Sequence, residues 1–339
     1  MKRYGHLFEQ IVAFDNLHRA ARRALLGKKN RLPVARFYFH LECALLRLEE
    51  ELLSGTYVPQ PYRSFPVFEP KPRQICAADI RDRVVHHAIC NIIGPILERL
   101  SIADSYACWK DKGTHRAMHR AQHFSRRYRY YLKLDVRQFF ASVDHRTLKE
   151  KLARKFKDEK LLTLLHRIID HPIPAGTSGK GLPIGNLTSQ YFANFYLGHQ
   201  DHYIKDELGV KGYLRYMDDM LLFGDDKETL HRLCAQVRAF LRDELALELK
   251  EESIRVAPVS QGISFLGFRI FPRLIRLQRS GWARFKRSVR AREQAYMKGD
   301  IDEKALVQSV QSLLGHVQHA DTLRLRQRFF NAAQEGRGL

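Results

Sequence analysis

The chain has 339 residues, enough to bury a substantial core and to form subdomains packed around a cleft. Its formal net charge of +21 and its pI near 9.9 favour a polyanionic partner, because each neutralised phosphate releases condensed counterions. The sequence has neither a signal-peptide pattern nor a long apolar span, and its five cysteines form no C-x-x-C pair, so we expect a cytoplasmic protein with reduced thiols and no membrane partner.

The first hundred residues combine helical and extended patterns. Apolar residues recur at helical spacing in residues 6–26 and 34–54, and Gly27-Lys28-Lys29-Asn30 forms the break between them. The stretch from Thr56 to Ala78 contains five prolines, which predicts extended structure. A helix at 79–100 follows, with Asp79 as its N-terminal cap.

Helices and short strands then interleave irregularly, which predicts an α+β fold rather than a doubly wound sheet. A basic helix at about 113–127 leads into the strand Tyr130–Leu134. Further helices are predicted at 145–155, 159–170, 186–207 and 227–243, with a Gly/Pro-rich loop at 171–185. Short strands at about 245–275 precede a basic helical tail.

Two adjacent carboxylates, Asp218 and Asp219, lie between two short runs with the pattern of a β-hairpin. A third carboxylate, Asp135, ends the strand Tyr130–Leu134. Crowded like charges repel unless a cation neutralises them, so we expect these acids to converge on divalent metal. Two Mg²⁺ ions held in this way are typical of enzymes that transfer phosphoryl groups.

A second acidic pair, Asp225-Asp226, serves as an internal comparison. It follows Gly224 and precedes Lys227-Glu228-Thr229-Leu230, which is the pattern of a turn followed by a helix cap. We therefore predict a structural role for this pair and a catalytic role for Asp218-Asp219.

Taken in order, the motifs resemble those of a reverse transcriptase over most of the chain. The residues that carry the resemblance are Lys71-Pro72-Arg73 and Arg81-Asp82-Arg83 (fingers), Leu134–Phe140 (first metal motif of the palm), Gly181–Gln190 (the loop-to-helix motif that supports template and nucleotide), Tyr216-Met217-Asp218-Asp219 (second metal motif) and Phe265-Leu266-Gly267 (primer grip). The resemblance implies a right-hand polymerase fold with fingers, a palm built on an antiparallel sheet, and a helical thumb. It also implies an RNA-directed DNA polymerase that binds template RNA, the RNA/cDNA duplex and dNTPs.

Within that family, Ile184-Gly185-Asn186-Leu187-Thr188-Ser189-Gln190 is most similar to the reverse transcriptases of diversity-generating retroelements. Most relatives have Gln in place of Ile184 and Pro in place of Gln190. No maturase, endonuclease or RNase H segment follows the basic tail, which agrees with this subtype. The resemblance implies error-prone copying at template adenines and a small oligomeric accessory variability protein. A group II intron-like, retron-like or defence-associated enzyme stays open as an alternative, and so does a nucleic-acid-binding scaffold without catalysis.

The resemblance assigns a role to each motif residue. Two Mg²⁺ ions, with Mn²⁺ as a substitute, are expected at Asp135, Asp218, Asp219 and the backbone carbonyl of Val136. Nucleotide binding is expected at Lys71, Arg73, Phe140, Ile184, Gly185 and Gln190. Contacts with nucleic acid are expected at Tyr216, Met217, Phe265, Leu266, Gly267, Arg284, Lys286, Arg287 and Arg290.

Each nucleotide-binding residue also has a structural interpretation. Lys71 and Arg73 clamp the triphosphate or lie in a solvated basic loop. Phe140 is either an aromatic gate against a ribose 2′-hydroxyl or a core residue, the role we expect for Phe139. Arg81 and Arg83 fit an internal ion-pair network as well as a finger segment. Gly181 and Gly185 either admit the substrate close to the backbone or are ordinary turn glycines.

Ile184 is the most informative of these residues. A glutamine there can hydrogen-bond near the nascent base pair, whereas isoleucine can only pack. Because a site discriminates strongly when a wrong partner leaves buried polar groups unpaired, we hypothesise that Ile184 and Gln190 lower fidelity.

Two basic regions complete the sequence evidence. Residues 269–298 hold ten Lys/Arg and one acid, Glu293, interleaved with Phe271, Trp282, Phe285 and Tyr296. This pattern suits a thumb that grips a duplex by its backbone, or a surface that docks the accessory protein. His115, His119 and His123 share one helix face beside several arginines, which predicts a phosphate-facing surface more than a zinc site.

We divide the chain into four parts on this basis. They are an N-terminal helical extension (1–55), fingers with part of the palm (56–130), the palm with its catalytic motifs and interleaved finger helices (131–262), and the primer grip with the basic thumb (263–339).

Overall fold

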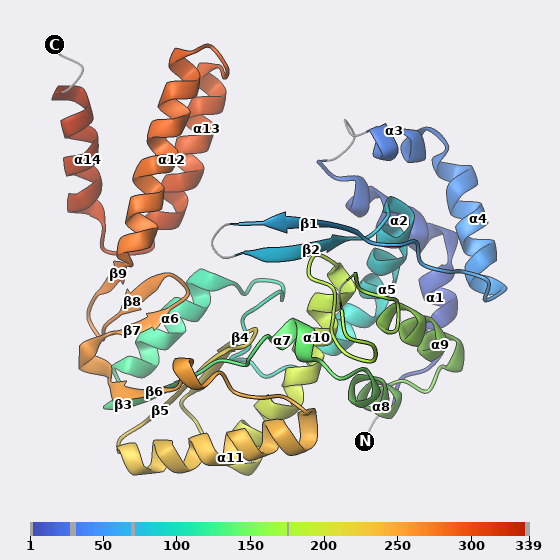
Figure 1. The fold of residues 1–339 in the computed structure, drawn as a ribbon, viewed down its shortest axis with the longest axis horizontal. Coiled ribbons are helices and arrows are strands. Elements are labelled where there is room, and N and C mark those ends of the chain that lie inside the picture. Colours follow the sequence, from blue (N-terminus) through green and yellow to red (C-terminus); the bar gives the residue numbers. More distant parts are fainter. Residues whose placement is uncertain (1–2, 28–31, 69–71, 175, 336–339) are drawn as a thin grey trace.

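A four-stranded antiparallel sheet in the order β4-β5-β3-β6 lies at the centre of the fold (Figure 1). The computed structural model describes residues 3–27, 32–68, 72–174 and 176–335. The strands are β3 (Tyr130–Leu134), β4 (Tyr213–Tyr216), β5 (Asp219–Gly224) and β6 (Arg255–Pro258). Strand β3 has the bounds predicted from the sequence, and the mixture of helices with an antiparallel sheet is the predicted α+β class.

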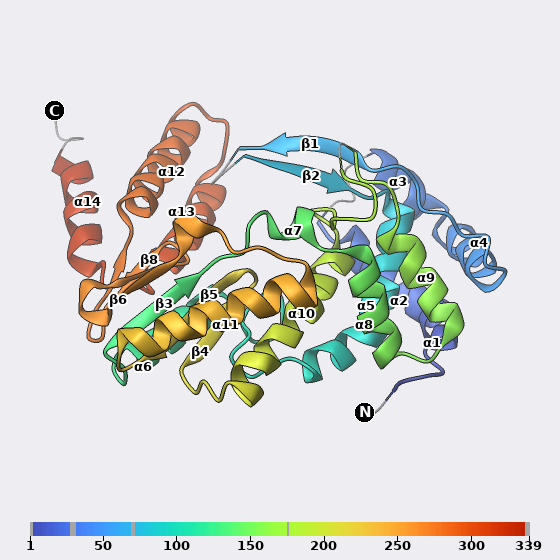
Figure 2. The same ribbon diagram turned by 60° about the horizontal axis from the view of Figure 1, so that its bottom comes forward.

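Alternating side chains bury both faces of this sheet, as the period of two in a strand requires. Tyr131, Leu221 and Phe223 share a core cluster with helix α6 (Thr114–Ser125). Leu132 and Leu222 belong to the larger cluster that includes α10 (Leu187–His202) and α11 (Lys227–Leu245). Figure 2 shows α11 lying along the sheet on that second side.

The N-terminal helices pack around α5 (Ile80–Arg99), to which Asp79 supplies the predicted cap by accepting a hydrogen bond from the Arg81 amide at 3.0 Å. They are α1 (Phe8–Val12), α2 (Phe14–Leu25), α3 (Leu32–Phe39) and α4 (Leu41–Leu53). Each of the two helices predicted here is divided, the first at Ala13, whose backbone is extended, and the second at His40. Apolar spacing survives such a break, which is why the sequence pattern did not reveal it.

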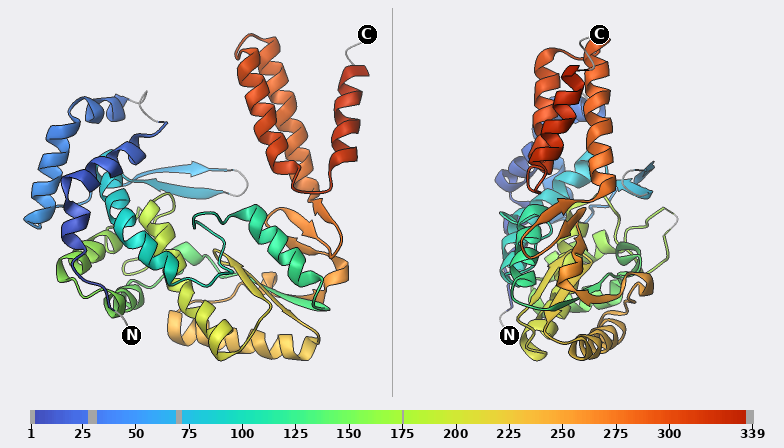
Figure 3. Two further views of the ribbon diagram at one scale, coloured as in Figure 1. Left: turned by 180° about the vertical axis from the view of Figure 1, so that it is seen from behind. Right: turned by 90° about the vertical axis from the view of Figure 1, so that its left-hand side faces the viewer.

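The proline-rich stretch contributes a two-stranded hairpin. Strands β1 (Arg63–Val67) and β2 (Arg73–Ala77) pair antiparallel, with Arg63 opposite Ala77. Figures 1 and 3 show the hairpin extending from the N-terminal helices over the sheet toward the C-terminal helices. The extended structure was predicted, but its pairing was not.

The segment between β3 and β4 contains α7 (Phe139–Ser142), α8 (His145–Lys155), α9 (Glu159–Ile169), α10 and the π-helical turn η1 (Tyr203–Glu207). All except the short α7 were predicted. Helix α11 begins where expected, because Asp226 accepts a hydrogen bond from the Thr229 amide at 2.6 Å. The structural interpretation of Asp225-Asp226 is therefore confirmed.

After β6 the chain forms a small sheet and then three helices. The 3-10 turns η2 (Glu251–Ser253) and η3 (Val259–Gln261) flank β6, and β7 (Ile263–Phe265), β8 (Phe268–Ile270) and β9 (Ile275–Leu277) form the sheet. Helices α12 (Arg279–Met297), α13 (Glu303–Val317) and α14 (Leu323–Glu335) project away from it (Figure 3).

Two further expectations can be compared with the structure. All five cysteines are free thiols, as predicted. Among the described helices, none combines the length and the apolar character that crossing a bilayer requires.

Candidate active site

The β4–β5 hairpin presents Asp218 and Asp219 at its tip. Tyr216 pairs with Asp219, which leaves Met217 and Asp218 as a two-residue turn, and Met217 adopts a left-handed φ of 54°. On the neighbouring strand, Leu134 pairs with Met220. Asp135 follows Leu134 directly, so the sheet register brings the third carboxylate beside the other two.

These carboxylates interact electrostatically. The pKa of Asp218 is raised to about 6 from 3.8, first by burial and then by the negative charge of Asp135, with a smaller contribution from Asp219. Arg73 on β2 acts in the opposite direction. Asp135 and Asp219 are therefore near enough to Asp218 for their negative charges to raise its pKa.

Asp219 is held by a neighbouring lysine. Lys133 Nζ lies 3.1 Å from Asp219 Oδ1 and donates a hydrogen bond to the Ser264 carbonyl at 3.1 Å. Asp219 Oδ1 is buried, and it accepts no well-oriented hydrogen bond from the described residues. An atom of this kind is suited to a cation, because oxygen ligands are what Mg²⁺ prefers.

The predicted metal cluster is not assembled in this conformation. Within the described ranges, no three His, Cys, Asp or Glu side chains lie close enough together to form a ready-made metal site. Val136 pairs with Leu249 in an isolated bridge and is buried, and the Asp135 carbonyl accepts a hydrogen bond from the Lys250 amide at 2.8 Å. The donor set fits a divalent ion in chemistry, and Asp219 Oδ1 lies against Lys133 in this structure.

A buried ion pair beneath the tip was missed by the sequence analysis. Arg215 and Asp201 are both 0% exposed, and two guanidinium nitrogens bond the carboxylate at 2.7 and 2.6 Å. Arg215 Nη1 also donates to the Met217 carbonyl at 3.0 Å, which fixes the turn that carries Asp218. The sequence feature that could have indicated this pair is an arginine inside an otherwise apolar strand.

Two further contacts complete this network. Tyr213 donates its hydroxyl to Asp201 at 2.7 Å, and Asn194 accepts from Arg215 at 3.1 Å. Burial, and then the charge of Asp201, raise the pKa of Tyr213 well above its usual value. Every member lies on α10 or β4, so the network ties the hairpin to the helix behind it.

A cavity of about 670 Å³ lies above the tip, and we call it the hairpin cavity. Its lining includes ten residues predicted for the site: Arg73, Phe140, Ile184, Gly185, Gln190, Tyr216, Met217, Asp218, Asp219 and Leu266. They come from β2, α7, the 171–185 loop, α10, both strands of the acidic hairpin and the β7–β8 turn. Lys71 lies outside the described residues.

The two adjacent phenylalanines have different environments. Phe139 is 2% exposed and belongs to the main core, whereas Phe140 is half-buried. Their rings lie 5.5 Å apart at 63°. The pair is positioned by Gln138, whose left-handed φ of 44° turns the chain out of Asp135 into α7.

The loop before α10 is anchored by its backbone. The Ile184 carbonyl accepts a hydrogen bond from the Cys76 amide of β2 at 2.8 Å. Gly185 has a φ of 117°, and a Cβ there would lie 2.9 Å from Ile75 Cγ2. The protein's own strand β2 therefore requires this glycine, which is a different reason from the predicted approach of substrate.

The second finger segment, Arg81-Asp82-Arg83, bonds to other parts of the protein and does not line the hairpin cavity. Arg81 forms an ion pair with Glu51, and Arg83 donates to the Ala78 carbonyl at 2.9 Å. The carboxylate between them, Asp82, accepts hydrogen bonds at 2.8 Å from the Tyr57 hydroxyl and the Gln60 amide. These residues form the internal network that was the alternative interpretation.

The β7–β8 turn beside the cavity requires one correction. Leu266 and Gly267 form the turn, with φ of 48° and 85°, and Gly267 is exposed. Phe265 is 1% exposed and packs in the α6 core cluster, so its side chain is not available to nucleic acid. For an aromatic residue at a strand end, the sequence does not show whether the side chain faces the core or a ligand.

Helix α12 separates its aromatic and basic residues. Phe285 and Val289 are buried, and Trp282 stacks on Phe285 at 5.1 Å. Phe329 of α14 contacts both rings, so these aromatics form the core of the C-terminal helices rather than a surface mixed with charge. Arg284, Arg287 and Arg290 are exposed and Lys286 is half-buried.

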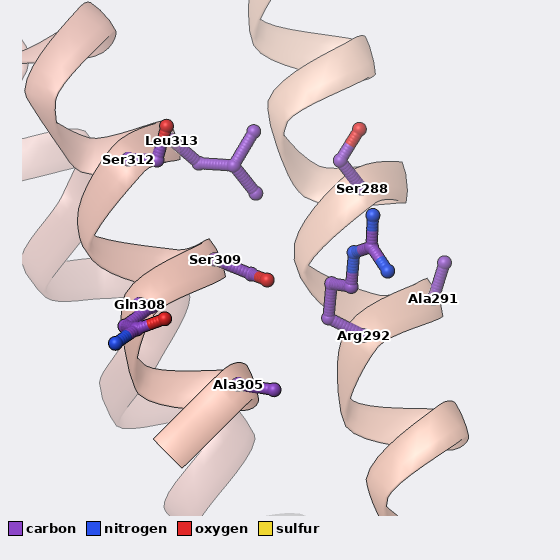
Figure 4. A pocket seen from close by; sticks show the side chains of 8 residues that line it. All are labelled: Ser288, Ala291, Arg292, Ala305, Gln308, Ser309, Ser312 and Leu313. Atoms are coloured by element: carbon purple, nitrogen blue, oxygen red, sulfur yellow. The ribbon is translucent and has the colours of Figure 1, made fainter. Parts of the chain in front are cut away.

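A groove of about 620 Å³ runs between α12 and α13 (Figure 4). Ser288, Ala291 and Arg292 form one side, and Ser309 and Ser312 contribute to the other. Small hydroxyl side chains and one arginine face each other across it in Figure 4.

The histidine face of α6 meets the C-terminal helices. The His115 ring stacks on His319 at 3.5 Å and lies 5.6 Å from His316. The pKa of His115 is lowered, first by burial and then by these two histidines. His115 is thus occupied by a packing contact, contrary to the expectation of a phosphate-facing surface, and these histidines form no ready-made metal site with other described residues.

Several known proteins are similar to this chain in sequence. The family described as reverse transcriptase (RNA-dependent DNA polymerase) matches residues 66–270, more than half of the chain. Protein YkfC of Escherichia coli (strain K12) is 26% identical over 266 residues, covering 66% of this chain and 70% of that protein. The group II intron-encoded protein LtrA of Lactococcus lactis subsp. cremoris is 22% identical over 309 residues, covering 69% of this chain and 50% of LtrA.

A solved structure supports the fold. Telomerase from Candida tropicalis, in complex with a fragment of telomeric RNA, superposes with a TM-score of 0.50 at 11% identity. The match covers 86% of this chain and 58% of the telomerase chain. At this identity the likeness concerns the fold alone, which is the right-hand polymerase fold that the motifs predicted.

Proposed function

This chain belongs to the reverse transcriptase family, and we propose that it copies template RNA into cDNA in the hairpin cavity as the polymerase of a diversity-generating retroelement. The observation that carries the proposal is the cavity itself, whose lining combines Arg73, Phe140 and Gln190 with the acidic tip. The match spans 50% of the length of LtrA.

The roles of the site residues follow from their positions. Reverse transcriptase domains use divalent metal ions, which when bound stabilise the attacking and leaving oxygens of phosphoryl transfer. Asp135, Asp218 and the Val136 carbonyl would hold the ions, which we take to be Mg²⁺. Asp219 would join them by turning away from Lys133. Arg73 would bind the triphosphate from above, through its planar fork.

The four-part division of the chain is part of this proposal. The β1–β2 hairpin would act as fingers, the sheet β4-β5-β3-β6 as the palm, and α12–α14 as the thumb. The exposed arginines of α12 and the hydroxyl-lined groove beside them suit contacts with a nucleic-acid backbone, which carry no sequence preference.

Phe140 is proposed to select deoxynucleotides. Replacing it by Ala should raise incorporation of ribonucleotides relative to deoxynucleotides by roughly tenfold or more, because the ring no longer excludes a 2′-hydroxyl. Single-nucleotide insertion with matched dNTP and rNTP pairs measures this ratio. Phe139→Leu is the control, since that side chain lies in the core. Unchanged sugar discrimination in Phe140→Ala would refute the gate.

Ile184 is proposed to lower fidelity. Its side chain lines the cavity, while its carbonyl bonds the Cys76 amide, so a new side chain need not disturb the loop. Ile184→Gln should reduce errors opposite template adenine, because an unpaired buried amide penalises a wrong base pair. Ile184→Leu, which keeps an apolar side chain, should retain the wild-type error spectrum. If the two variants give the same spectrum, Ile184 does not contribute.

One experiment tests the proposed function as a whole. The purified chain, alone and with its template RNA and accessory protein, is given an adenine-rich template, and the cDNA is sequenced. We expect cDNA with errors concentrated at adenines, and none from Asp218→Asn. Faithful cDNA would retain the polymerase and remove the retroelement subtype.

The second candidate is a group II intron-type reverse transcriptase. The 22% identity to LtrA favours it. The segment Ile184–Gln190 supports the first candidate instead, and a template repeat beside a variable repeat in the genome would decide between them.

A further inference from the structure

A second cavity, of about 380 Å³, lies at the other end of α10 from the hairpin cavity. Helices α5, α8 and α10 all end around it, and we call it the helix-end cavity. Its walls are mainly apolar and include Leu97, Leu100 and Phe195. Gln190 in the first cavity and His199 in the second lie about 14 Å apart along the helix axis, at 1.5 Å per residue.

The cavity is lined by a lysine that no acid offsets. Lys155 is 7% exposed, and its ammonium makes no hydrogen bond or ion pair with the described residues. Burial lowers its pKa, and no carboxylate acts against that effect. Buried lysines are normally paired, because removing an ammonium from water is unfavourable.

A second polar group in the same wall lacks a partner. His199 Nε2 is buried, with no hydrogen-bond partner in the part of the chain that the structure describes. The pKa of His199 is lowered to about 3, first by burial and then by Lys151 and Lys155. The imidazole is therefore neutral, and His199 lines the cavity as an uncharged ring beside Lys155.

The helix ends do not account for these groups. Cations favour helix C-termini because the carbonyls there carry partial negative charge. Here those carbonyls already have donors: Lys155 O accepts from the Tyr4 amide at 2.8 Å, and Leu100 O pairs with His202 Nε2 at 2.9 Å. These carbonyls therefore do not serve as partners for the side chains of Lys155 and His199.

We propose that the helix-end cavity binds a small organic anion, whose acidic group meets the Lys155 ammonium and whose apolar body packs on Leu97, Leu100 and Phe195. The volume is within the range of small-molecule sites, which combine apolar walls with a few convergent polar groups. This site is separate from the polymerase cavity and goes beyond the proposed function.

Isothermal titration calorimetry on the full chain tests the proposal with naphthalene-1-sulfonate and with its neutral analogue naphthalene-1-sulfonamide. We expect one sulfonate per chain, bound about tenfold or more tighter than the sulfonamide, because only the anion forms an ion pair with the Lys155 ammonium. Equal affinities would show an apolar cavity without anion recognition. Decanoate provides a second probe, and absence of saturable binding by both anions would overturn the proposal.

Gly198 offers a blocking variant that should fold. A Cβ at this position meets no atom within 4 Å, and the residue lines the cavity. Gly198→Phe should fill the space and abolish binding, while its unfolding temperature stays at or above the wild-type value, because glycine is a weak helix former. Unaltered binding in this variant would place the anion elsewhere.

Lys151 supplies a matched control one turn earlier on α8. It is equally buried, at 7%, but Glu244 acts on it and it does not line the cavity. Lys155→Met should weaken sulfonate binding about tenfold or more, whereas Lys151→Met should change it little. An RNA/DNA duplex should not displace the probe. Displacement would assign the anion to the nucleic-acid surface and sink the proposal, whatever the polymerase activity.

Discussion

Asp218→Asn is expected to lower primer extension on the order of a thousandfold or more, because a metal site contributes several kcal/mol to phosphoryl transfer and each 1.4 kcal/mol is about tenfold in rate. Asp225→Asn is the matched control, since Asp225 accepts a hydrogen bond from the Arg129 amide at 3.2 Å and lies outside the cavity. Extension by Asp218→Asn at the rate of the control would end the assignment of Asp218 as a metal ligand.

The same substitution should stabilise the metal-free fold at neutral pH. A carboxyl pKa raised to about 6 from 3.8 means that the folded state binds the proton more tightly than the unfolded chain. The charged form therefore destabilises the fold by up to about 3 kcal/mol above pH 6, and this penalty disappears as the pH falls toward 4. Asn carries no such charge.

Urea denaturation in chelator at pH 7 and at pH 4 measures this effect. The free energy of unfolding of Asp218→Asn should exceed that of the wild type at pH 7 and match it at pH 4. An equal difference at both pH values would mean that ionisation of the Asp218 carboxyl is not its cause.

Breaking the buried pair beneath the hairpin is expected to have the largest effect on stability. Arg215→Met leaves the Asp201 carboxylate buried without its cation, which should lower the free energy of unfolding by about 3–5 kcal/mol. It also removes the donor to the Met217 carbonyl, so polymerase activity should fall with it. Arg242→Met is the control, because the Arg242–Asp243 pair is exposed and should contribute little.

A triple variant separates the two consequences. In Asp201→Leu/Tyr213→Phe/Arg215→Met, the ion pair and the hydroxyl that donates to it are all replaced by apolar groups, which is often neutral for stability. Stability should largely return while activity stays low, because the Met217 carbonyl still lacks its donor. Full activity in the triple variant would contradict a positioning role for Arg215.

Local patterns predicted the elements whose signals are local. Strand Tyr130–Leu134 and helix His145–Lys155 have the predicted bounds, and Asp79 and Asp226 cap the helices that follow them. The breaks at Ala13 and His40 were not predicted, because they change the direction of a helix without changing its apolar spacing.

The sequence predicted only those residues of the site that belong to a recognised motif. Ten of them line one cavity, yet the partners that hold them there were missed. Lys133 forms an ion pair with Asp219, and Arg215 forms one with Asp201. The spacing of these residues in the sequence does not predict that they meet. Phe265 was assigned to nucleic acid but lies in the core, because one aromatic residue fits either environment.

From its residues alone, the chain determined most of its helices and strands, its basic character and the acidic pair of the hairpin. These properties depend on periodicity and charge, which can be recognised from the order of the residues in the chain. The tertiary structure decided which of those acids is held by a lysine, which glycine a neighbouring strand requires, and which cavity Lys155 lines without a counter-charge. Such features depend on distances between segments far apart in the chain, and only the packed fold sets those distances.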